Sequence, residues 1–142
     1  MEERRAKRNS KNRPAGTMLL EPVSSVKKED MKRMVIDKVF PAIRESMPHE
    51  LRHKIIIQQD NASPHKYVGD PEVVEASKKD GWNIEVRYQP SNSPDLNILD
   101  LGFFNAIQSV QHTTYVTNYR DLVNCVVRSY WGMSSETINK TF

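Results

Sequence analysis

The 142-residue sequence predicts an α/β fold of alternating strands and helices. Residues 55–57 are three isoleucines without polar alternation, which is typical of a strand covered on both faces of a parallel or mixed sheet. Residues 83–88 alternate polar and apolar side chains, as a half-exposed strand near a sheet edge does. With the helical patterns around them, the predicted order is strand, helix, strand, helix, strand, helix, helix, which is that of a layered α/β domain.

The first part of the chain predicts one strand and one long helix. Residues 17–23 form the strand, which Pro22 confines to an edge or an end because proline cannot donate to a sheet ladder. A helix of about 20 residues follows Ser25, its expected N-cap, with apolar side chains at helical spacing (Met31, Met34, Val35, Val39, Ile43 and Met47). Pro41 removes the hydrogen bond to the Asp37 carbonyl, so we expect a kink there.

Three more helices follow. Asp70 and Pro71 predict a helix start as N-cap and first helical residue, and Gly81 ends that helix. Residues 94–111 predict a second helix with one apolar stripe (Leu96, Leu99, Phe103, Ile107 and Val110). Residues 119–131 predict a third, with its own stripe (Leu122, Val123, Val126, Val127 and Tyr130).

Composition narrows the class of protein. The mean hydropathy is −0.67, and no apolar run approaches the roughly 20 residues of a membrane span, so we expect no membrane partner. The amino terminus lacks the apolar centre of a secretory signal. The lone Cys125 rules out an internal disulfide and is expected to be a small core residue. We expect Trp82 and Trp131 to be core residues rather than platforms for base stacking.

The positive charge is concentrated at the amino terminus. Residues 1–14 sum to +4 within a net charge of +3, with two acids, Glu2 and Glu3, against six basic side chains (Arg4, Arg5, Lys7, Arg8, Lys11 and Arg13). We expect these residues to form a disordered basic tail. Its charge suits nucleic-acid contact or nuclear import, and equally a solvated arm without a partner.

Two aspartates are the candidate catalytic and metal-binding residues. Asp60 follows the isoleucines at the carboxyl end of a strand, where open α/β sheets place their ligand sites. Asp100 lies one residue beyond Leu99, close to an apolar stripe, where a carboxylate is costly unless a cation or a partner neutralises it. Two such carboxylates can share a divalent metal ion. The alternatives are a turn-forming role for Asp60 and, for Asp100, a border position with its tip in water.

Four polar neighbours stay outside the catalytic set. Asp95 falls in the first turn of the predicted 94–111 helix, where an acid stabilises the helix dipole, so we assign it to capping. His65 could contact a metal ligand or a phosphate, but a turn histidine is more often structural. Asn61 and Asn97 could position a metal-bound water or a DNA phosphate, or simply make turn and cap hydrogen bonds.

Two sequence blocks resemble the catalytic core of mariner-like transposases, in the DDE/DDD superfamily, most closely the plant-type branch with three catalytic aspartates. The block QQDNASPH at 58–65 resembles the surroundings of the family's second catalytic acid. The block QPSNSPDLNILDLGFF at 89–104 resembles the surroundings of its third, and IQSVQ at 107–111 continues that helix. The block SKNRPAGT at 10–17 resembles a stretch just upstream of the third strand, so the similarity extends over about residues 8–142.

The resemblance implies a ribonuclease H-like three-layer fold and metal-dependent cleavage and strand transfer of DNA. Asp60 and Asp100 would be catalytic ligands of Mg²⁺ or Mn²⁺. The implied partners are DNA, in the form of transposon ends, and a second copy in a homodimer. The implied location is the nucleus, without a small-molecule substrate.

The same resemblance predicts that the chain is truncated at both ends. The family's first acid and its helix-turn-helix module lie upstream of the SKNRPAGT block, so residues 15–142 would be a partial catalytic domain without its first strands. Its metal site would be incomplete, and the chain alone inactive. The alternatives are a repurposed DNA-binding or interaction module and a non-functional transposon remnant.

Overall fold

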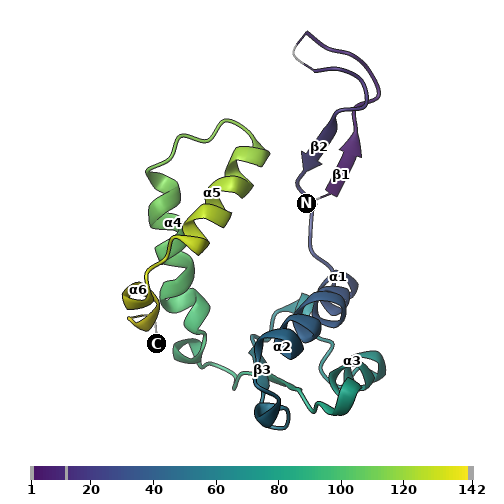
Figure 1. Ribbon diagram of the computed structural model, residues 1–142, viewed down its shortest axis with the longest axis vertical. Helices are drawn as coiled ribbons and strands as arrows, with labels where there is room; N and C mark the ends of the chain where they lie inside the picture. The colour runs from purple at the N-terminus through teal and green to yellow at the C-terminus, as the bar shows by residue number, and fades with distance from the viewer. Residues whose placement is uncertain (1, 12, 141–142) are drawn as a thin grey trace. The chain divides into compact units, whose positions relative to one another are not determined.

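The computed structural model describes residues 2–11 and 13–140 and is an α/β structure of two compact units (Figure 1). We name the units by their place in the sequence. The central unit, residues 25–97, holds a pair of parallel strands and a hydrophobic core. The outer unit, residues 1–24 and 98–142, holds a β-hairpin and the carboxyl-terminal helices. This division differs from the expected one, a tail over 1–14 and one domain over 15–142.

One long helix opens the central unit. It consists of α1 (Lys28–Met34), a π-helical segment (Val35–Val39) and α2 (Phe40–Ser46). Its N-cap is Lys27 rather than Ser25, because the Asp30 side chain accepts the backbone N–H of Lys27 at 2.9 Å. Pro41 lacks the N–H that would bond to the Asp37 carbonyl, and the turn before it is π-helical and so wider than an α-helical turn, while the expected kink stays a prediction.

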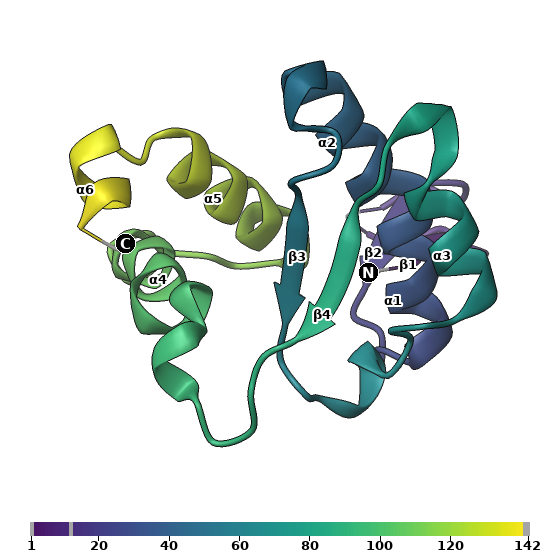
Figure 2. The same cartoon turned by 90° about the horizontal axis from the view of Figure 1, so that it is seen from below.

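The sheet of the central unit is a β–α–β arrangement. Strand β3 (Ile56–Gln59) pairs in parallel with β4 (Glu85–Tyr88), in the register Ile56 to Glu85 and Gln59 to Tyr88 (Figure 2). Helix α3 (Pro71–Ser77) connects them. Short 3₁₀ turns lie at residues 49–51, 63–65, 79–81 and 94–96.

Helix α3 begins where the sequence predicts, but it ends at Ser77, before the predicted end at Gly81. The Asp70 carboxylate accepts the backbone N–H of Glu72 at 3.1 Å, and Pro71 is the first helical residue. After a 3₁₀ turn, Gly81 reverses the chain at φ 76°, in the left-handed region that glycine adopts without strain.

The core lies on one face of the β3–β4 pair. It contains six buried side chains (Val35, Phe40, Tyr67, Val73, Trp82 and Ile84). Ile57 of β3, Val86 of β4 and Ile55, which directly precedes β3, pack against them. Trp82 is buried as expected. The expectation that β3 is covered on both faces is wrong for this chain, because Ile56 points to the other face and is 51% exposed.

The outer unit differs from the sequence expectation at its amino terminus. Residues 2–5, expected in a disordered tail, form strand β1 (Glu2–Arg5), because each pairs antiparallel with a residue of β2 (Met18–Glu21). Strand β2 falls inside the predicted 17–23 strand. It lies at an edge, as Pro22 requires.

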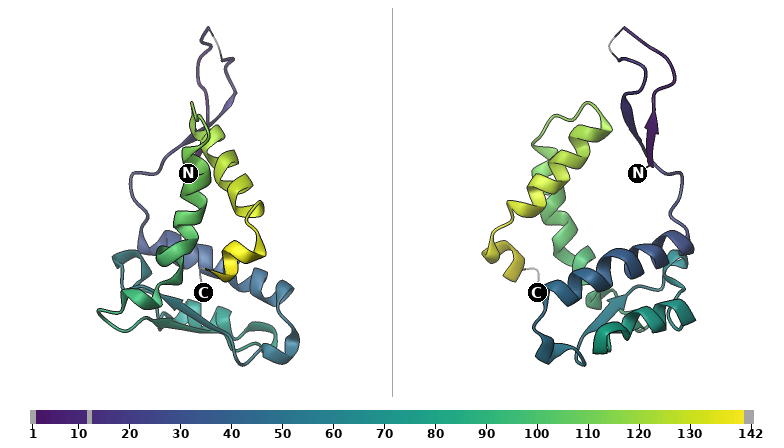
Figure 3. Two further views of the ribbon diagram at one scale, coloured as in Figure 1. Left: turned by 90° about the vertical axis from the view of Figure 1, so that its left-hand side faces the viewer. Right: turned by 45° about the vertical axis from the view of Figure 1, so that its right-hand side comes forward.

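Two longer helices complete most of the outer unit. Helix α4 (Phe104–His112) and helix α5 (Tyr119–Trp131) form an antiparallel pair (Figure 3), and a short helix α6 (Ser135–Asn139) follows. Helix α5 has the predicted bounds, with Cys125 buried within it as expected. Trp131 is 79% exposed, against expectation, because it is the last residue of the helix.

The predicted 94–111 helix is wrong at its start. Pro94–Leu96 is a separate 3₁₀ turn, and Asn97 leaves the helical region with ψ at 77°. The continuous helix then begins with a π-helical segment (Leu99–Phe103) that runs into α4. Asp95 therefore lies in the 3₁₀ turn, not in the first turn of the long helix.

Candidate functional site

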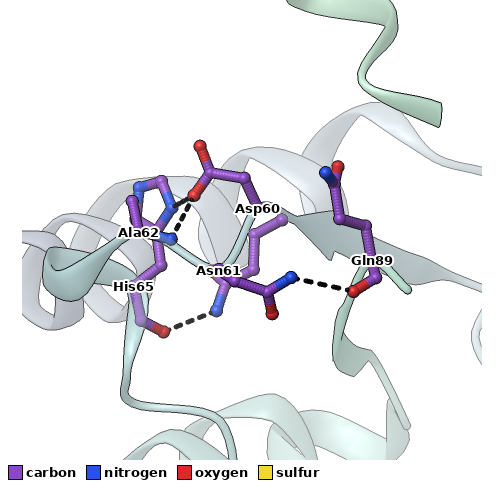
Figure 4. Close-up of polar contacts among 6 residues, drawn as sticks. Asp60, Asn61, Ala62, His65 and Gln89 are labelled. Atoms are coloured by element: carbon purple, nitrogen blue, oxygen red, sulfur yellow. Dashed lines mark hydrogen bonds and ion pairs between the residues drawn. The ribbon is translucent and has the colours of Figure 1, made fainter. Parts of the chain in front are cut away.

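Asp60 lies directly after β3, at the end of the sheet where β4 also finishes (Figure 4). Parallel strands bring their carboxyl ends to one edge, the usual place for ligands in open α/β sheets. The loop after Asp60 is tied to this edge because the Asn61 side chain donates to the Gln89 carbonyl at 3.2 Å. The Gln59 side chain donates to the His65 carbonyl at 2.7 Å. Asp60 therefore projects from a cross-linked loop.

One oxygen of the Asp60 carboxylate is held by two donors. Its Oδ1 accepts the backbone N–H of Ala62 at 2.9 Å and contacts Nδ1 of His65. The 3₁₀ turn Ser63–His65 returns the histidine ring to the aspartate. Oδ2 points away from both donors in Figure 4 and makes no hydrogen bond with the part of the chain that the structure describes. The side chain is 35% exposed, so Oδ2 can be reached by a ligand.

The two donors also set the charge of the site. The hydrogen bond from the Ala62 backbone lowers the pKa of the Asp60 carboxyl, and the bond and positive charge of His65 lower this pKa further against partial burial. Asp60 is therefore ionised at neutral pH. An ionised carboxylate with one accessible oxygen is a suitable ligand for a hard divalent cation.

A buried tyrosine supports the histidine. Tyr67 is a core residue whose ring meets the His65 ring edge to face, with centroids 6.5 Å apart. Burial raises the pKa of the Tyr67 phenol, and the nearby Tyr88 and Asp60 raise it further. The phenol therefore stays neutral, and its ring limits the positions that His65 can take.

Asp100 lies in the outer unit. It is exposed in the π-helical segment Leu99–Phe103, and Leu99 beside it is exposed too. The expectation that Asp100 borders a buried face is wrong for the described chain, because full burial in this helix begins only at Ile107. Since Asp60 belongs to the central unit, the closeness of the two carboxylates stays a prediction.

The two sequence blocks do meet within the central unit, upstream of Asp100. The Gln58 side chain on β3 donates to the carbonyl of Leu96 at 2.9 Å. Gln58 neighbours the strand end that carries Asp60, and Leu96 is four residues before Asp100. This contact holds the middle of the second block against the first. Asn97, which follows Leu96, is the last residue of the central unit.

His65, which the sequence places outside the catalytic set, contacts Asp60 in the structure. The usable signal was the spacing of five residues from aspartate to histidine across a Ser-Pro turn. Within residues 2–11 and 13–140, no three His, Cys, Asp or Glu side chains gather in a group that could hold a metal ion. Asp60 and His65 are thus a pair of candidate groups rather than a complete ligand set.

Comparison with known proteins does not identify the chain: no protein-family model, curated protein or solved structure matches it. Among the helices that the structure describes, none is long and apolar enough to cross a membrane. Function is therefore inferred from the residues and their geometry.

Proposed function

We propose that the chain supplies two carboxylates, Asp60 and Asp100, of a Mg²⁺- or Mn²⁺-dependent site for cutting and joining DNA. The observation that supports this proposal most directly is the position of the Asp60 carboxylate at the carboxyl end of β3, with Oδ1 held by two donors and Oδ2 accessible. Holding one oxygen fixes the side chain before an ion arrives, so less conformational entropy is lost on binding. Such ions take carboxylate oxygens as ligands.

The ribonuclease H-like fold of mariner-like transposases is part of the proposal. The parallel β3–α3–β4 unit supports it, because it places neighbouring strand ends at one edge of a sheet. Among the described residues, β3 pairs only with β4, so its second edge is open to a further strand. In the proposed fold, that neighbour carries the family's first acid.

The contact between Gln58 and Leu96 supports a shared site for the two aspartates. Four residues of extended chain span at most about 14 Å, so Asp100 lies within that distance of Leu96 whatever the chain does between them. Asp60 is two residues from Gln58. We therefore propose that the carboxyl carbons approach within about 8 Å, the reach of two ligands on a paired metal site.

The bound ions would supply the chemistry. Held by Asp60 and Asp100, Mg²⁺ or Mn²⁺ would supply activation of water or a 3′-hydroxyl and stabilisation of the leaving oxygen. The chain's own contribution is to hold Asp60 ionised and oriented through Ala62 and His65. Because two carboxylates hold an ion less tightly than three, we expect weak metal binding and no cleavage of a transposon end by this chain alone.

A Mn²⁺ titration followed by electron paramagnetic resonance tests the proposal. Asp60→Asn and Asp100→Asn should each weaken binding at least about tenfold, since even a group behind a ligand can contribute that much. Asp95→Asn, an exposed acid of the neighbouring 3₁₀ turn, is the matched control and should bind as the unchanged chain does.

Nuclear magnetic resonance separates a shared site from two isolated acids. Bound Mn²⁺ should broaden amide signals around both Asp60 and Asp100. Broadening confined to one of them would contradict the shared site. Metal-dependent nicking by the purified chain, abolished by Asp60→Asn, would contradict the expected inactivity.

A further inference from the structure

In the hairpin of the outer unit, backbone hydrogen bonds continue beyond the two strands into the loop that joins them. The backbone pairing of β1 and β2 continues past the ends of the strands at the base of the loop. There the Ala6 N–H donates to the Thr17 carbonyl at 2.9 Å, and the Gly16 N–H donates to the Ala6 carbonyl at 2.8 Å. Gly16 takes φ 87°, which closes this end. Further out, Ser10 and Arg13 exchange both backbone hydrogen bonds, at 2.8 and 3.1 Å. The loop therefore continues the hairpin as a narrow ribbon (Figure 1).

The loop carries a concentration of positive charge. Lys7, Arg8, Lys11 and Arg13 are all exposed, and none forms an ion pair with an acid among residues 2–11 and 13–140. The sequence has no acidic residue from position 4 to position 20. Four uncompensated cations on one loop favour a polyanionic partner. We call residues 7–11 and 13 the basic loop.

We propose that the basic loop is a docking surface for double-stranded DNA, in which the ribbon enters the major groove and its lysines and arginines contact phosphates. The major groove of B-form DNA is about 12 Å wide and admits a two-stranded β-ribbon. The major groove of A-form RNA is deep and narrow and excludes side chains. A membrane is a poorer partner, because positions 7–17 contain no large apolar or aromatic side chain to insert.

This inference goes beyond the proposed catalytic function. It shares a DNA partner with that function but needs neither a metal ion nor Asp60 or Asp100. Binding is therefore measured in EDTA, where a failed metal site has no effect. If the chain did not bind metal but still bound DNA, only the catalytic proposal would be contradicted.

The test is fluorescence anisotropy of the full chain with a B-form duplex of about two helical turns, roughly 20 base pairs. The test variant changes Lys7, Arg8, Lys11 and Arg13 to Gln. The control removes the same charge from exposed residues of the central unit, with Lys28, Lys38, Lys78 and Lys79 changed to Gln. Thermal melts followed by circular dichroism check that both variants fold as the unchanged chain does. If the fourfold basic-loop variant does not fold, the double variant Lys11→Gln with Arg13→Gln replaces it.

The unchanged chain should bind DNA with a Kd of about 10⁻⁶ to 10⁻⁴ M and a steep salt dependence. The basic-loop variant should bind at least about tenfold more weakly, and its slope of log K against log salt should be shallower by up to about 3.6, since each phosphate contact contributes roughly 0.9. The control should stay close to the unchanged chain.

Four results would overturn the inference. They are no DNA binding by the unchanged chain at low salt, equal loss in the control variant, equal affinity for an RNA duplex of the same sequence, and tighter binding to phosphatidylserine vesicles than to DNA.

Discussion

At the scale of single residues, the orientation of Asp60 is a local property. Both donors to its Oδ1, the Ala62 backbone and the His65 ring, come from the five residues that follow it. Contacts of such short sequence separation form without distant parts of the fold. The core enters only through Tyr67, whose buried ring meets His65. The candidate ligand is thus preset by its own turn.

The lowered pKa of Asp60 predicts a dependence of stability on pH. In the unfolded chain this carboxyl titrates near about 3.9, and in the folded chain below it. Its stabilisation is therefore complete above the unfolded value and is lost as pH falls through the folded one. We expect Asp60→Asn to flatten the rise of the free energy of unfolding with pH in this acid range. The effect should stay below about 1 kcal/mol because the group is partly solvated.

Urea unfolding at a series of pH values measures this effect. Because the Ala62 backbone bond is the larger cause, His65→Ala should flatten the curve only in part. Asp95→Asn, in its exposed turn, should leave it unchanged. Equal flattening by His65→Ala and Asp60→Asn would show instead that the histidine dominates.

The sequence could predict where Asp60 lies but not what it contacts. Three isoleucines before Gln-Gln-Asp-Asn indicate a strand end, since buried strands finish where polar residues begin. The contact with His65 depends on the 3₁₀ path of Ser63–His65, which brings the ring back to Oδ1. That path is a matter of dihedral angles, and residue types alone leave several turn geometries open.

At the scale of elements, a buried lysine joins two helices of the central unit. The Lys32 ammonium on α1 lies 3.0 Å from Glu72, 3.2 Å from Glu29 and 3.6 Å from Asp70. Its side chain is only 11% exposed, and its hydrogen bonds to Glu72 and Glu29 raise its pKa. Asp70 is also the N-cap of α3, so one cation stabilises both the start of α3 and its contact with α1.

We predict that Lys32→Ala lowers the Tm of the chain, since it removes the common partner of three carboxylates and leaves the partly buried Asp70 without its cation. Lys28→Ala, on the exposed side of the same helix, should leave the Tm nearly unchanged. Differential scanning calorimetry measures both. A Lys28→Ala variant that melts as early as Lys32→Ala would contradict this role.

Helices α3 and α5, which have side-chain N-caps, were predicted closely, and the helix expected from Pro94 was not. Helix α3 is marked by Asp70 and Pro71, and α5 has the predicted bounds with Asn118 as its N-cap. The stretch after Pro94 offered an equally good helix start by composition. The structure puts a 3₁₀ turn there, because Asn97 adopts a non-helical conformation after it. Apolar periodicity continues through such a break and cannot reveal it.

At the scale of the whole molecule, the boundary between the units runs through a sequence block. Residues 89–104 read as one motif, yet the central unit ends at Asn97 and the outer unit resumes at Ile98. The sequence does change here, from mostly polar residues at 89–97 to mostly apolar residues at 98–104, but such a change also marks the start of a helix within one domain. Domain boundaries depend on which contacts form across the chain, and no single segment contains that information.

The open edge of the central sheet predicts how the molecule behaves in solution. Among the described residues, β3 pairs only with β4, and Ile56 on it is 51% exposed. An apolar strand with free backbone donors and acceptors is a template for pairing with another chain. We expect the chain to self-associate through β3 at rising concentration, and sedimentation velocity measures this.

A charge on the edge strand should oppose that association, because lysines protect natural sheet edges from pairing. Ile56→Lys should therefore shift the chain towards monomer, whereas Val74→Lys, at an exposed apolar position of α3, should not. Supplying a neighbouring strand in trans should have the same effect as Ile56→Lys, since it would occupy the edge. A monomer with one sharp cooperative melt above about 60 °C, near the top of the usual mesophile range, would show that the chain completes its own sheet.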